Sequence, residues 1–316
     1  MSDLPAPRRG LFVGLCTLDS VYRLPHVPAR NEKAVATRHD VAAGGPAANA
    51  AVTFAALGGR GTLLTGVGQH PLAEWMCSEL ATRGVSVVDA TPDRREPPAM
   101  STVYVEDASG ERSIVSLNAT GSTASPPAHL PALVTGADVV VIDGHHAGLC
   151  RAAAIEARTH EIPVVLDGGN WKPGMEDVLP HVDIAACSAD FRVPKTSTAP
   201  ESATALRDRG VPAVVVTRGA DPVLWFTAHG DGETPVPLVE VHDTLGAGDA
   251  FHGALAWALG ARDLPAAIAF AVRVASLRVR VPGPRAWLAD GALRQLADDA
   301  RHTASPMRQA LARPLI

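Results

Sequence analysis

The stretch that decides the fold reads Asp243-Thr244-Leu245-Gly246-Ala247-Gly248-Asp249-Ala250-Phe251-His252-Gly253-Ala254-Leu255. The apolar run at 235–241 before it predicts a strand, and the alanine-rich run at 254–259 predicts a helix. Small residues let the turn between them come close to a ligand. The unpaired N–H groups and the dipole at the start of the helix favour an anion there, such as a phosphate.

Asp249 follows the two glycines of this turn. A carboxylate beside a bound phosphate would repel it, which makes sense if Asp249 acts as a base on the incoming nucleophile. In phosphoryl transfer, a carboxylate that orients or deprotonates a hydroxyl is a recurring part. The alternative is an ordinary strand-turn-helix connection in which the aspartate caps the helix.

A second stretch reads Gly44-Gly45-Pro46-Ala47-Ala48-Asn49-Ala50-Ala51-Val52. The glycine pair leads into a predicted helix of small residues that stops at Gly58. Asn49 either hydrogen-bonds a hydroxylated ligand or caps the helix or faces solvent. Asp19 follows a predicted buried strand at 10–15, at the place where open α/β sheets bind their ligands. A turn aspartate is the alternative interpretation of Asp19.

Strands and helices alternate along the rest of the chain. Strands are expected at 137–143, 162–167, 184–187 and 213–217, and helices at 148–160, 203–209, 265–279 and 291–311. This order predicts a parallel sheet with right-handed crossovers. Alternating segments at 101–105 and 112–117 predict a hairpin, which forms a small second sheet with edge-strand pieces at 21–37. Surface loops are expected at 121–131 and 194–202.

Composition limits the class of protein. The 316 residues are 47% hydrophobic, which suits one large α/β domain. A net charge of −5 without a basic block argues against nucleic acid as a partner. No run approaches a membrane span and residues 1–10 lack a signal-peptide core, so we expect a cytoplasmic protein without membrane contact. The four cysteines are scattered, which predicts free thiols.

The stretches at 44–52 and 243–255 together resemble the two signatures of the ribokinase (PfkB) family of carbohydrate kinases, in the family's order. The likeness extends to Gly66-Val67-Gly68, 80–85 and 280–283. It implies one domain over 1–316: a doubly wound, mostly parallel sheet flanked by helices, with a β-sheet lid at roughly 15–40 and 98–120. It also implies ATP-dependent phosphorylation of a sugar hydroxyl, a primary one, and a homodimer formed through the lid.

The resemblance also implies roles for individual residues. Asp249 matches the family's catalytic base, and Gly246, Ala247 and Gly248 match its anion hole. Sugar contacts match Asp19, Gly44, Gly45 and Asn49, with Lys33, Asn118, His145 and His252 as further candidates. The candidates for ATP are Thr217, Gly219, Lys172, Thr244, Gly246 and Gly248. Mg²⁺ accompanies the ATP, and Asp243 matches a residue near a monovalent-cation site, which predicts sensitivity to K⁺.

The chain departs from the family pattern in its nucleotide half. The usual Asn-x-x-Glu pair is replaced by Cys187-Ser188-Ala189-Asp190-Phe191, which leaves Asp190 as the candidate near Mg²⁺. The usual Thr-x-Gly-x-x-Gly loop ends in Pro222, which lacks an N–H donor. The stretch at 167–172 resembles an Asp-x-Asn-x-Arg segment of fructokinase-like members, so Lys172 either meets phosphate as a point charge or is a solvated lysine.

The substrate is less closely defined by the sequence. Gly-Pro-Ala-Ala at 45–48, Lys33, Asn118 and 252–255 look like the sulfofructose kinase branch, but that branch carries an arginine where this chain has His145. His145 is either a sugar contact or a loop residue. The alternatives to a sugar kinase are a nucleoside kinase on the same fold and a non-catalytic sugar- or nucleotide-binding relative. Aromatic residues make up only 4% of the chain, which disfavours a pocket for a nucleobase.

Overall fold

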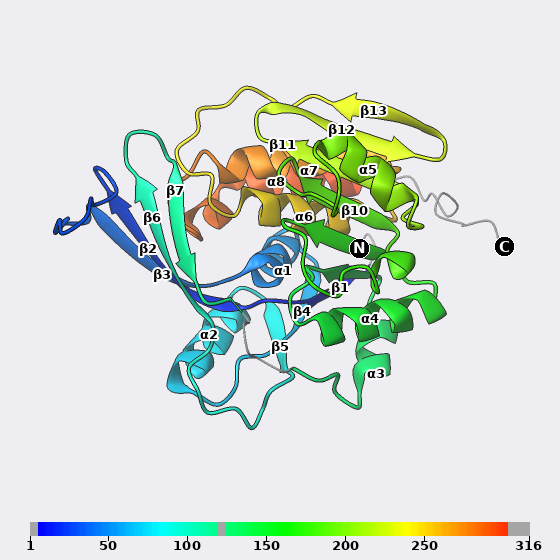
Figure 1. Cartoon of the computed structure of the whole chain (residues 1–316), viewed down its shortest axis with the longest axis horizontal. Coiled ribbons are helices and arrows are strands. Elements are labelled where there is room, and N and C mark those ends of the chain that lie inside the picture. The colour runs from blue at the N-terminus through cyan, green and yellow to red at the C-terminus, as the bar shows by residue number, and fades with distance from the viewer. Residues whose placement is uncertain (1–5, 119–123, 303–316) are drawn as a thin grey trace.

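A computed structural model describes residues 6–118 and 124–302 and contains two β-sheets (Figure 1). The larger sheet orders its strands as β13 (Gly230–Thr234), β12 (Asp221–Thr227), β11 (Ala213–Arg218), β10 (Ile184–Ser188), β9 (Val164–Gly168), β8 (Val139–Ile142), β1 (Arg9–Val13), β4 (Arg60–Thr65) and β5 (Val85–Asp89). The strands from β10 to β5 pair in parallel, as β11 does with β10. The doubly wound, mostly parallel sheet expected from the sequence is confirmed.

Helices cover both faces of the larger sheet and bury two hydrophobic clusters. Phe12 belongs to one cluster, whereas Leu11 and Val13 belong to the other, because successive side chains of a strand point to opposite faces. The Phe12 face packs against α1 (Pro46–Ala56), α2 (Pro71–Thr82), α6 (Ala247–Ala258), α7 (Leu264–Arg278) and α8 (Gly291–His302). The opposite face packs against α3 (Leu130–Thr135), α4 (Ala147–Thr159) and α5 (Ala199–Arg207). Two 3₁₀ turns, η1 (Leu179–His181) and η2 (Ala286–Ala289), complete the elements described.

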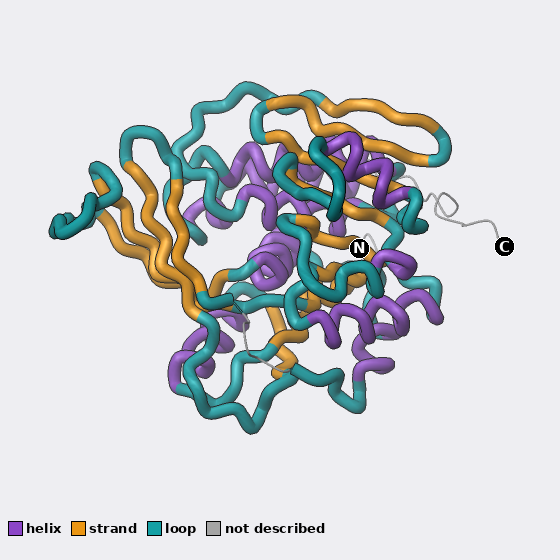
Figure 2. The backbone as a smooth tube through the Cα atoms, viewed as in Figure 1, coloured by secondary structure: helices purple, strands orange, loops and turns teal. Residues whose placement is uncertain are grey.

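The smaller sheet orders its strands as β3 (Arg38–Gly44), β2 (Thr17–Leu24), β6 (Met100–Glu106) and β7 (Arg112–Ser116). Figure 2 shows it projecting at one side of the molecule, and β3 contacts α1 and α2. The hairpin predicted around Ser109-Gly110 is confirmed, since β6 and β7 pair antiparallel. Its inner face buries Val21, Val103 and Val105, against which Leu245 packs. The smaller sheet therefore reaches the turn that precedes α6.

The first strand of the chain marks the point where the winding of the larger sheet changes direction. β1 lies between β4 and β8, and the chain proceeds from it to either side. Such a point is where open α/β sheets form a crevice for ligands. Asp143, just past β8, accepts hydrogen bonds from the Leu15 N–H at 2.8 Å and the Ala47 N–H at 3.3 Å. It thereby fixes the entries to β2 and α1 at this edge.

Several expectations were wrong in detail. Residues 235–241 form no strand, because Pro235 and Pro237 lack an N–H donor, and Leu238 is fully exposed. Residues 199–202, expected in a loop, are the first turn of α5. Asp19 lies inside β2 and not in a turn. α8 is described as far as His302, so the predicted helical residues 303–311 lie outside the described residues, as do 121–123 of the expected loop.

Candidate active site

Close packing of α1 against α6 brings the two sequence signatures together. A Cβ atom on Gly253 would overlap the carbonyl oxygen of Ala50, so only glycine allows this approach. Across the contact, Asn49 Nδ2 donates a hydrogen bond of 2.8 Å to Asp249 Oδ2. The two polar side chains that the sequence singled out are thus direct partners, 200 residues apart in the chain.

The turn before α6 is built on glycine. Gly246 caps the helix with φ of 72°, a left-handed conformation that favours glycine. A Cβ atom there would lie 3.7 Å from Asp249 Oδ2 and 3.9 Å from Arg278 Nε. Gly248 is exposed, and a Cβ on it would meet nothing within 4 Å. Open space therefore adjoins the Cα of Gly248 in the first turn of α6, the part of a helix at which anions bind.

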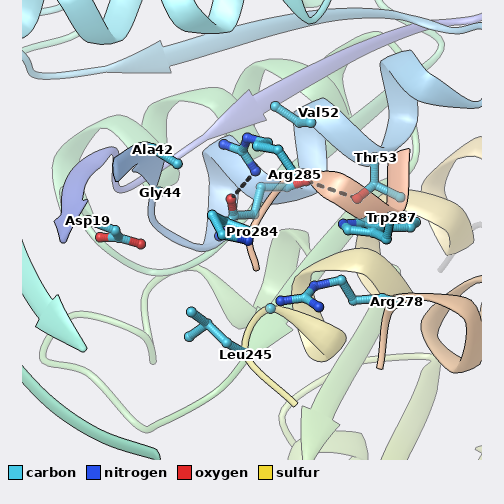
Figure 3. Close-up of a pocket in the computed structure, with 12 residues that line it drawn as sticks. Asp19, Ala42, Gly44, Val52, Thr53, Leu245, Arg278, Pro284, Arg285 and Trp287 are labelled. Atoms are coloured by element: carbon cyan, nitrogen blue, oxygen red, sulfur yellow. Dashed lines mark hydrogen bonds between the residues drawn. The ribbon is translucent and has the colours of Figure 1, made fainter. Parts of the chain in front are cut away.

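A pocket lies beside this turn (Figure 3). Its lining includes four of the residues expected at the site, namely Asp19, Gly44, Asn49 and Gly246. The remainder of the lining is Ala42, Val52, Thr53, Leu245, Arg278, Pro284, Arg285 and Trp287. The smaller sheet, α1, the turn before α6, the end of α7 and the segment after it therefore contribute to one cavity.

Asp249 is a carboxylate in a poorly solvated and acidic environment. Burial and, secondarily, the charge of the neighbouring Asp167 raise its pKa to about 6, against the opposing effects of the hydrogen bond from Asn49 and the charge of His252. A base is most effective when its pKa lies near the operating pH. The environment of Asp249 thus suits a proton acceptor.

Asp19 lies across the pocket on β2 and has a similar environment. Burial raises its pKa to about 6, against the lowering effect of hydrogen bonds from Thr17 and Ser101. Thr17 Oγ1 donates to Asp19 Oδ1 at 2.6 Å. A Cβ on Gly44 would overlap the Asp19 carboxylate, so the glycine makes room for it. Asp19 is therefore held in one position, half-buried at the pocket wall.

Two arginines that the sequence analysis did not identify line the same pocket. Arg278 on α7 is 2% exposed, and its Nη2 lies 3.2 Å from Asp243 Oδ2. Arg285 donates from Nη1 to Asn49 Oδ1 at 2.9 Å. Their partners are 35 and 236 residues away, a separation that no local pattern reveals.

The Asp243 carboxylate is occupied by groups of the protein. Besides Arg278, its Oδ2 accepts from the Gly283 N–H at 2.9 Å, and its Oδ1 accepts from the Leu245 N–H at 2.9 Å. The side chain is 1% exposed. A guanidinium thus stands where the sequence led us to expect a monovalent cation, and the structure gives no support to a K⁺ site at this carboxylate.

The other sugar-contact candidates are placed outside the pocket lining. Lys33 is exposed in the loop between β2 and β3, and Asn118 is exposed beyond β7, where its Oδ1 accepts from Ser116. His145 follows β8 and its Nδ1 lies 3.3 Å from Asp143 Oδ1. Gly45 caps α1 with φ of 93° and approaches the Leu15 carbonyl.

His252 is buried behind α6 rather than in the pocket. Its Nε2 donates to the Ala186 carbonyl at 3.0 Å, and its Nδ1 lies 3.3 Å from Asp167 Oδ2. The resemblance made His252 a candidate sugar contact, but its ring faces the larger sheet. Its influence on the site is electrostatic.

The nucleotide candidates lie at the ends of the next strands. Thr217, near the end of β11, pairs with Ser188 at the end of β10, and the exposed Gly219 follows with φ of 63°. Lys172 lies beyond β9, where its Nζ donates to the Asn170 carbonyl at 3.3 Å. Thr244 Oγ1 accepts from Arg112 of the smaller sheet at 2.6 Å. Thr217, Gly219 and Lys172 therefore lie at or beyond the carboxyl ends of strands of the larger sheet, whereas Thr244 lies in the turn before α6.

Asp190 is exposed, two residues past β10. Across the described ranges, no group of three or more His, Cys, Asp or Glu side chains is arranged to hold a metal ion. All four cysteines are free thiols, as expected. No helix of the described segments is long and apolar enough to cross a membrane.

Comparison with known proteins identifies related sequences and structures. The profile described as "pfkB family carbohydrate kinase" matches residues 11–290. The ribokinase of Bacillus subtilis (strain 168) is 28% identical over 283 residues, which cover 84% of this chain and 91% of the relative. A candidate ribokinase from Agrobacterium tumefaciens has a TM-score of 0.82 at 25% identity, with coverage of 94% and 98% of the two chains. Arabidopsis thaliana ribokinase, complexed with ribose and ATP, has a TM-score of 0.75 at 22% identity, with coverage of 94% and 99%.

Proposed function

Because the chain belongs to the pfkB family of carbohydrate kinases, we propose that it transfers the γ-phosphate of ATP to a primary hydroxyl of a small sugar or sugar derivative. The observation that carries this proposal is the placement of Asp249. The carboxylate lies at the glycine turn of α6 and is held by Asn49, which lines a pocket together with the fixed carboxylate of Asp19. This is the arrangement that hydroxyl activation beside a phosphate needs.

Asp249 is the base in this proposal. Its Oδ2 accepts from Asn49, so its Oδ1 takes the hydrogen bond and then the proton of the attacking hydroxyl. The N–H groups of 246–248 at the start of α6 stabilise the charge on the transferring phosphate. Asp19, Gly44 and Asn49, which line the pocket, orient the remaining hydroxyls. Positioning of the hydroxyl and of the phosphate, rather than covalent chemistry, supplies the rate enhancement.

ATP extends from the α6 turn along the edge formed by Thr217, Gly219, Lys172 and Thr244. The Arabidopsis relative carries both ribose and ATP, which supports this pairing of ligands. Mg²⁺ is bound mostly by phosphate oxygens and water and needs only one or two carboxylates. The exposed Asp190 fits such a minimal role. When bound, Mg²⁺ would offset the negative charge that develops on the phosphates.

K⁺ does not fit the residue that suggested it. Asp243 directs its oxygens to Arg278, Gly283 and Leu245. The buried guanidinium supplies a positive charge beneath the α6 turn without an added ion. We therefore leave K⁺ out of the proposal.

The smaller sheet is proposed as a lid and as a dimer contact, within one domain over 1–316. Its inner face meets Leu245 of the α6 turn and its strands carry Asp19 and Gly44, so movement of the sheet would open or close the pocket. Its outer face exposes Val41, Met100 and Val115. Since a small sheet needs its apolar faces covered, a second copy of the chain is the proposed partner. The proposed location is the cytoplasm, a compartment that supplies ATP.

A nucleoside kinase is the alternative on this fold, and Trp287 is the one aromatic side chain in the pocket lining. A non-catalytic relative is the second alternative, although a fixed base beside an anion site serves no purpose in simple binding. ATP consumption by the purified chain with Mg²⁺, measured across sugars, sugar acids and nucleosides, distinguishes the three. We expect turnover with a sugar or sugar acid. Turnover with nucleosides alone, or sugar binding without any ATP consumption, would contradict the proposal.

A further inference from the structure

Arg285 is anchored by three elements around the pocket. Nη1 donates to Asn49 Oδ1 on α1 at 2.9 Å, and Nη2 donates to the Ala43 carbonyl on β3. Nε lies 3.1 Å from Glu79 Oε1 on α2, and the two side chains are only 12% and 13% exposed. The planar guanidinium is a rigid fork, so three such contacts leave it one orientation. Figure 3 shows Arg285 at the pocket, opposite Arg278.

The contact with Arg285 determines which way the Asn49 amide faces. A guanidinium only donates hydrogen bonds, so the amide must present Oδ1 to it. Nδ2 then faces Asp249 Oδ2 at 2.8 Å. The reversed amide would set donors against donors at Arg285 and an oxygen against the carboxylate. Arg285 therefore makes one of the two amide orientations strongly favourable.

We propose that Arg285 is a positioning residue for phosphoryl transfer, which orients Asn49 so that Asn49 holds Asp249 in place as the base. Glu79, which is not part of the pocket lining, anchors the guanidinium through Nε. Asn49 thereby acquires a role toward Asp249 besides any contact with the sugar. This inference rests on the proposed function of Asp249.

The bond from Asn49 also affects the charge on Asp249. Asp249 also interacts electrostatically with four other ionisable groups on different elements. They are Asp19 (β2), Asp167 (β9), His252 (α6) and Arg278 (α7). The two aspartates raise the pKa of Asp249, and Asn49 and His252 lower it. If Arg285 is lost, the amide can rotate away and Asp249 takes up a proton at a higher pH.

The test compares Arg285→Met, Arg285→Lys and the control Arg83→Met. Arg83 contacts the same Glu79 oxygen at 3.4 Å, but its side chain is 41% exposed and lies outside the pocket lining. We expect kcat of both Arg285 variants to fall by about 10- to 100-fold, the effect of one charged hydrogen bond. Lysine keeps the charge but cannot reproduce the fork. The acid limb of the kcat profile should move to higher pH, and Arg83→Met should change neither quantity.

A double-mutant cycle separates positioning from a structural role. If Arg285 acts through Asn49, then Arg285→Met in an Asn49→Ala background changes kcat by less than about twofold. If the wild-type enzyme is active and the two losses of kcat are additive, the positioning role of Arg285 is overturned while the proposed kinase function stands. Additive losses would indicate that Arg285 acts directly on Asp19 or on the fold. If Arg285→Met does not fold, the same cycle is measured with Arg285→Lys. An unchanged acid limb in the kcat profile of Arg285→Lys would also overturn the proposal. Wild-type kcat in Asp249→Asn would instead remove the role of Asp249 and this inference with it.

Discussion

The two sides of the candidate active site are built in contrasting ways. On the acceptor side, side chains interlock: Glu79 holds Arg285, which holds Asn49, which holds Asp249. On the nucleotide side, Gly219 and Asp190 are exposed. The Nζ of Lys172 there donates to a backbone carbonyl two residues away.

This difference fits the different demands of the two ligands. The attacking hydroxyl must be placed within a fraction of an ångström of its reactive position, because misplacement by about 1 Å can cost about 100-fold in rate. Such accuracy needs side chains locked by their neighbours. A nucleotide offers many phosphate oxygens and a metal ion, so backbone N–H groups and single charges suffice to bind it. Substitutions on the acceptor side should therefore cost more activity.

A matched pair of glycine substitutions gives the largest contrast. In Gly44→Ala the new Cβ displaces the Asp19 carboxylate, so the KM for the sugar should rise by about 10- to 100-fold, as for a lost charged hydrogen bond. In Gly219→Ala the Cβ meets nothing within 4 Å, and only the left-handed backbone is strained, by about 1 kcal/mol. The KM for ATP should then change by less than about threefold. Equal effects of the two substitutions would remove the contrast.

The pH dependence of the rate should report the acceptor side. The pKa values of Asp249 and Asp19 are each raised to about 6, chiefly by burial. Both carboxylates must be ionised for catalysis, so kcat/KM should be constant above pH 7 and fall about tenfold or more per unit below pH 6. Rates measured from pH 4.5 to 9 would test this, with folding checked by circular dichroism. Full activity at pH 5 is incompatible with the assigned roles.

Substitution of Lys172 should have a modest effect on the nucleotide side. Lys172 is a single, partly exposed charge. An ion pair between such a charge and an ATP phosphate contributes less than about 1 kcal/mol to binding. Lys172→Met should therefore raise the KM for ATP by no more than about fivefold and leave kcat for the sugar nearly unchanged. Lys195→Met, at an exposed loop lysine, is the control and should change nothing. A hundredfold loss of kcat would show that this side is as tightly organised as the other.

The smallest effect on chemistry is expected from the outer face of the lid sheet. Val115 on β7 is 69% exposed, and Val115→Glu should weaken a dimer formed through this face because it buries a charge. Sedimentation at micromolar concentration should show a dimer for the wild type and more monomer for the variant. Thr159→Glu, at the exposed end of α4, serves as the control. A fully active wild-type monomer at that concentration would exclude the dimer.

The sequence predicted those parts of the fold that short-range patterns specify. Glycine before a run of small residues placed α1, and the glycine turn placed the start of α6. Alternation placed the hairpin of β6 and β7. The same patterns failed at 235–241, where apolar residues suggested a strand, since prolines remove donors and apolar character alone does not guarantee a pairing partner.

The site was predictable only as far as its motifs extend. Asp19, Gly44, Asn49 and Gly246 stand in or beside the two signatures and meet in the pocket. Arg278 and Arg285 stand outside them, and their importance follows from distant partners that tertiary packing supplies. His252 stands inside a signature yet faces the sheet, because helical spacing does not reveal which side a ring is packed on.

The central claim is that Asp249 acts as the base on the acceptor hydroxyl, and kcat of Asp249→Asn with the best acceptor from the panel tests it most directly. Asparagine keeps the shape and removes a carboxylate whose pKa is raised, so at pH 8 the folded state loses no stability and ATP still binds. General-base assistance contributes about 10²- to 10⁴-fold, and kcat should fall by that factor while the KM for the sugar changes less. If Asp249 only caps α6, asparagine serves equally well. A variant that keeps more than about a tenth of wild-type kcat would contradict the claim.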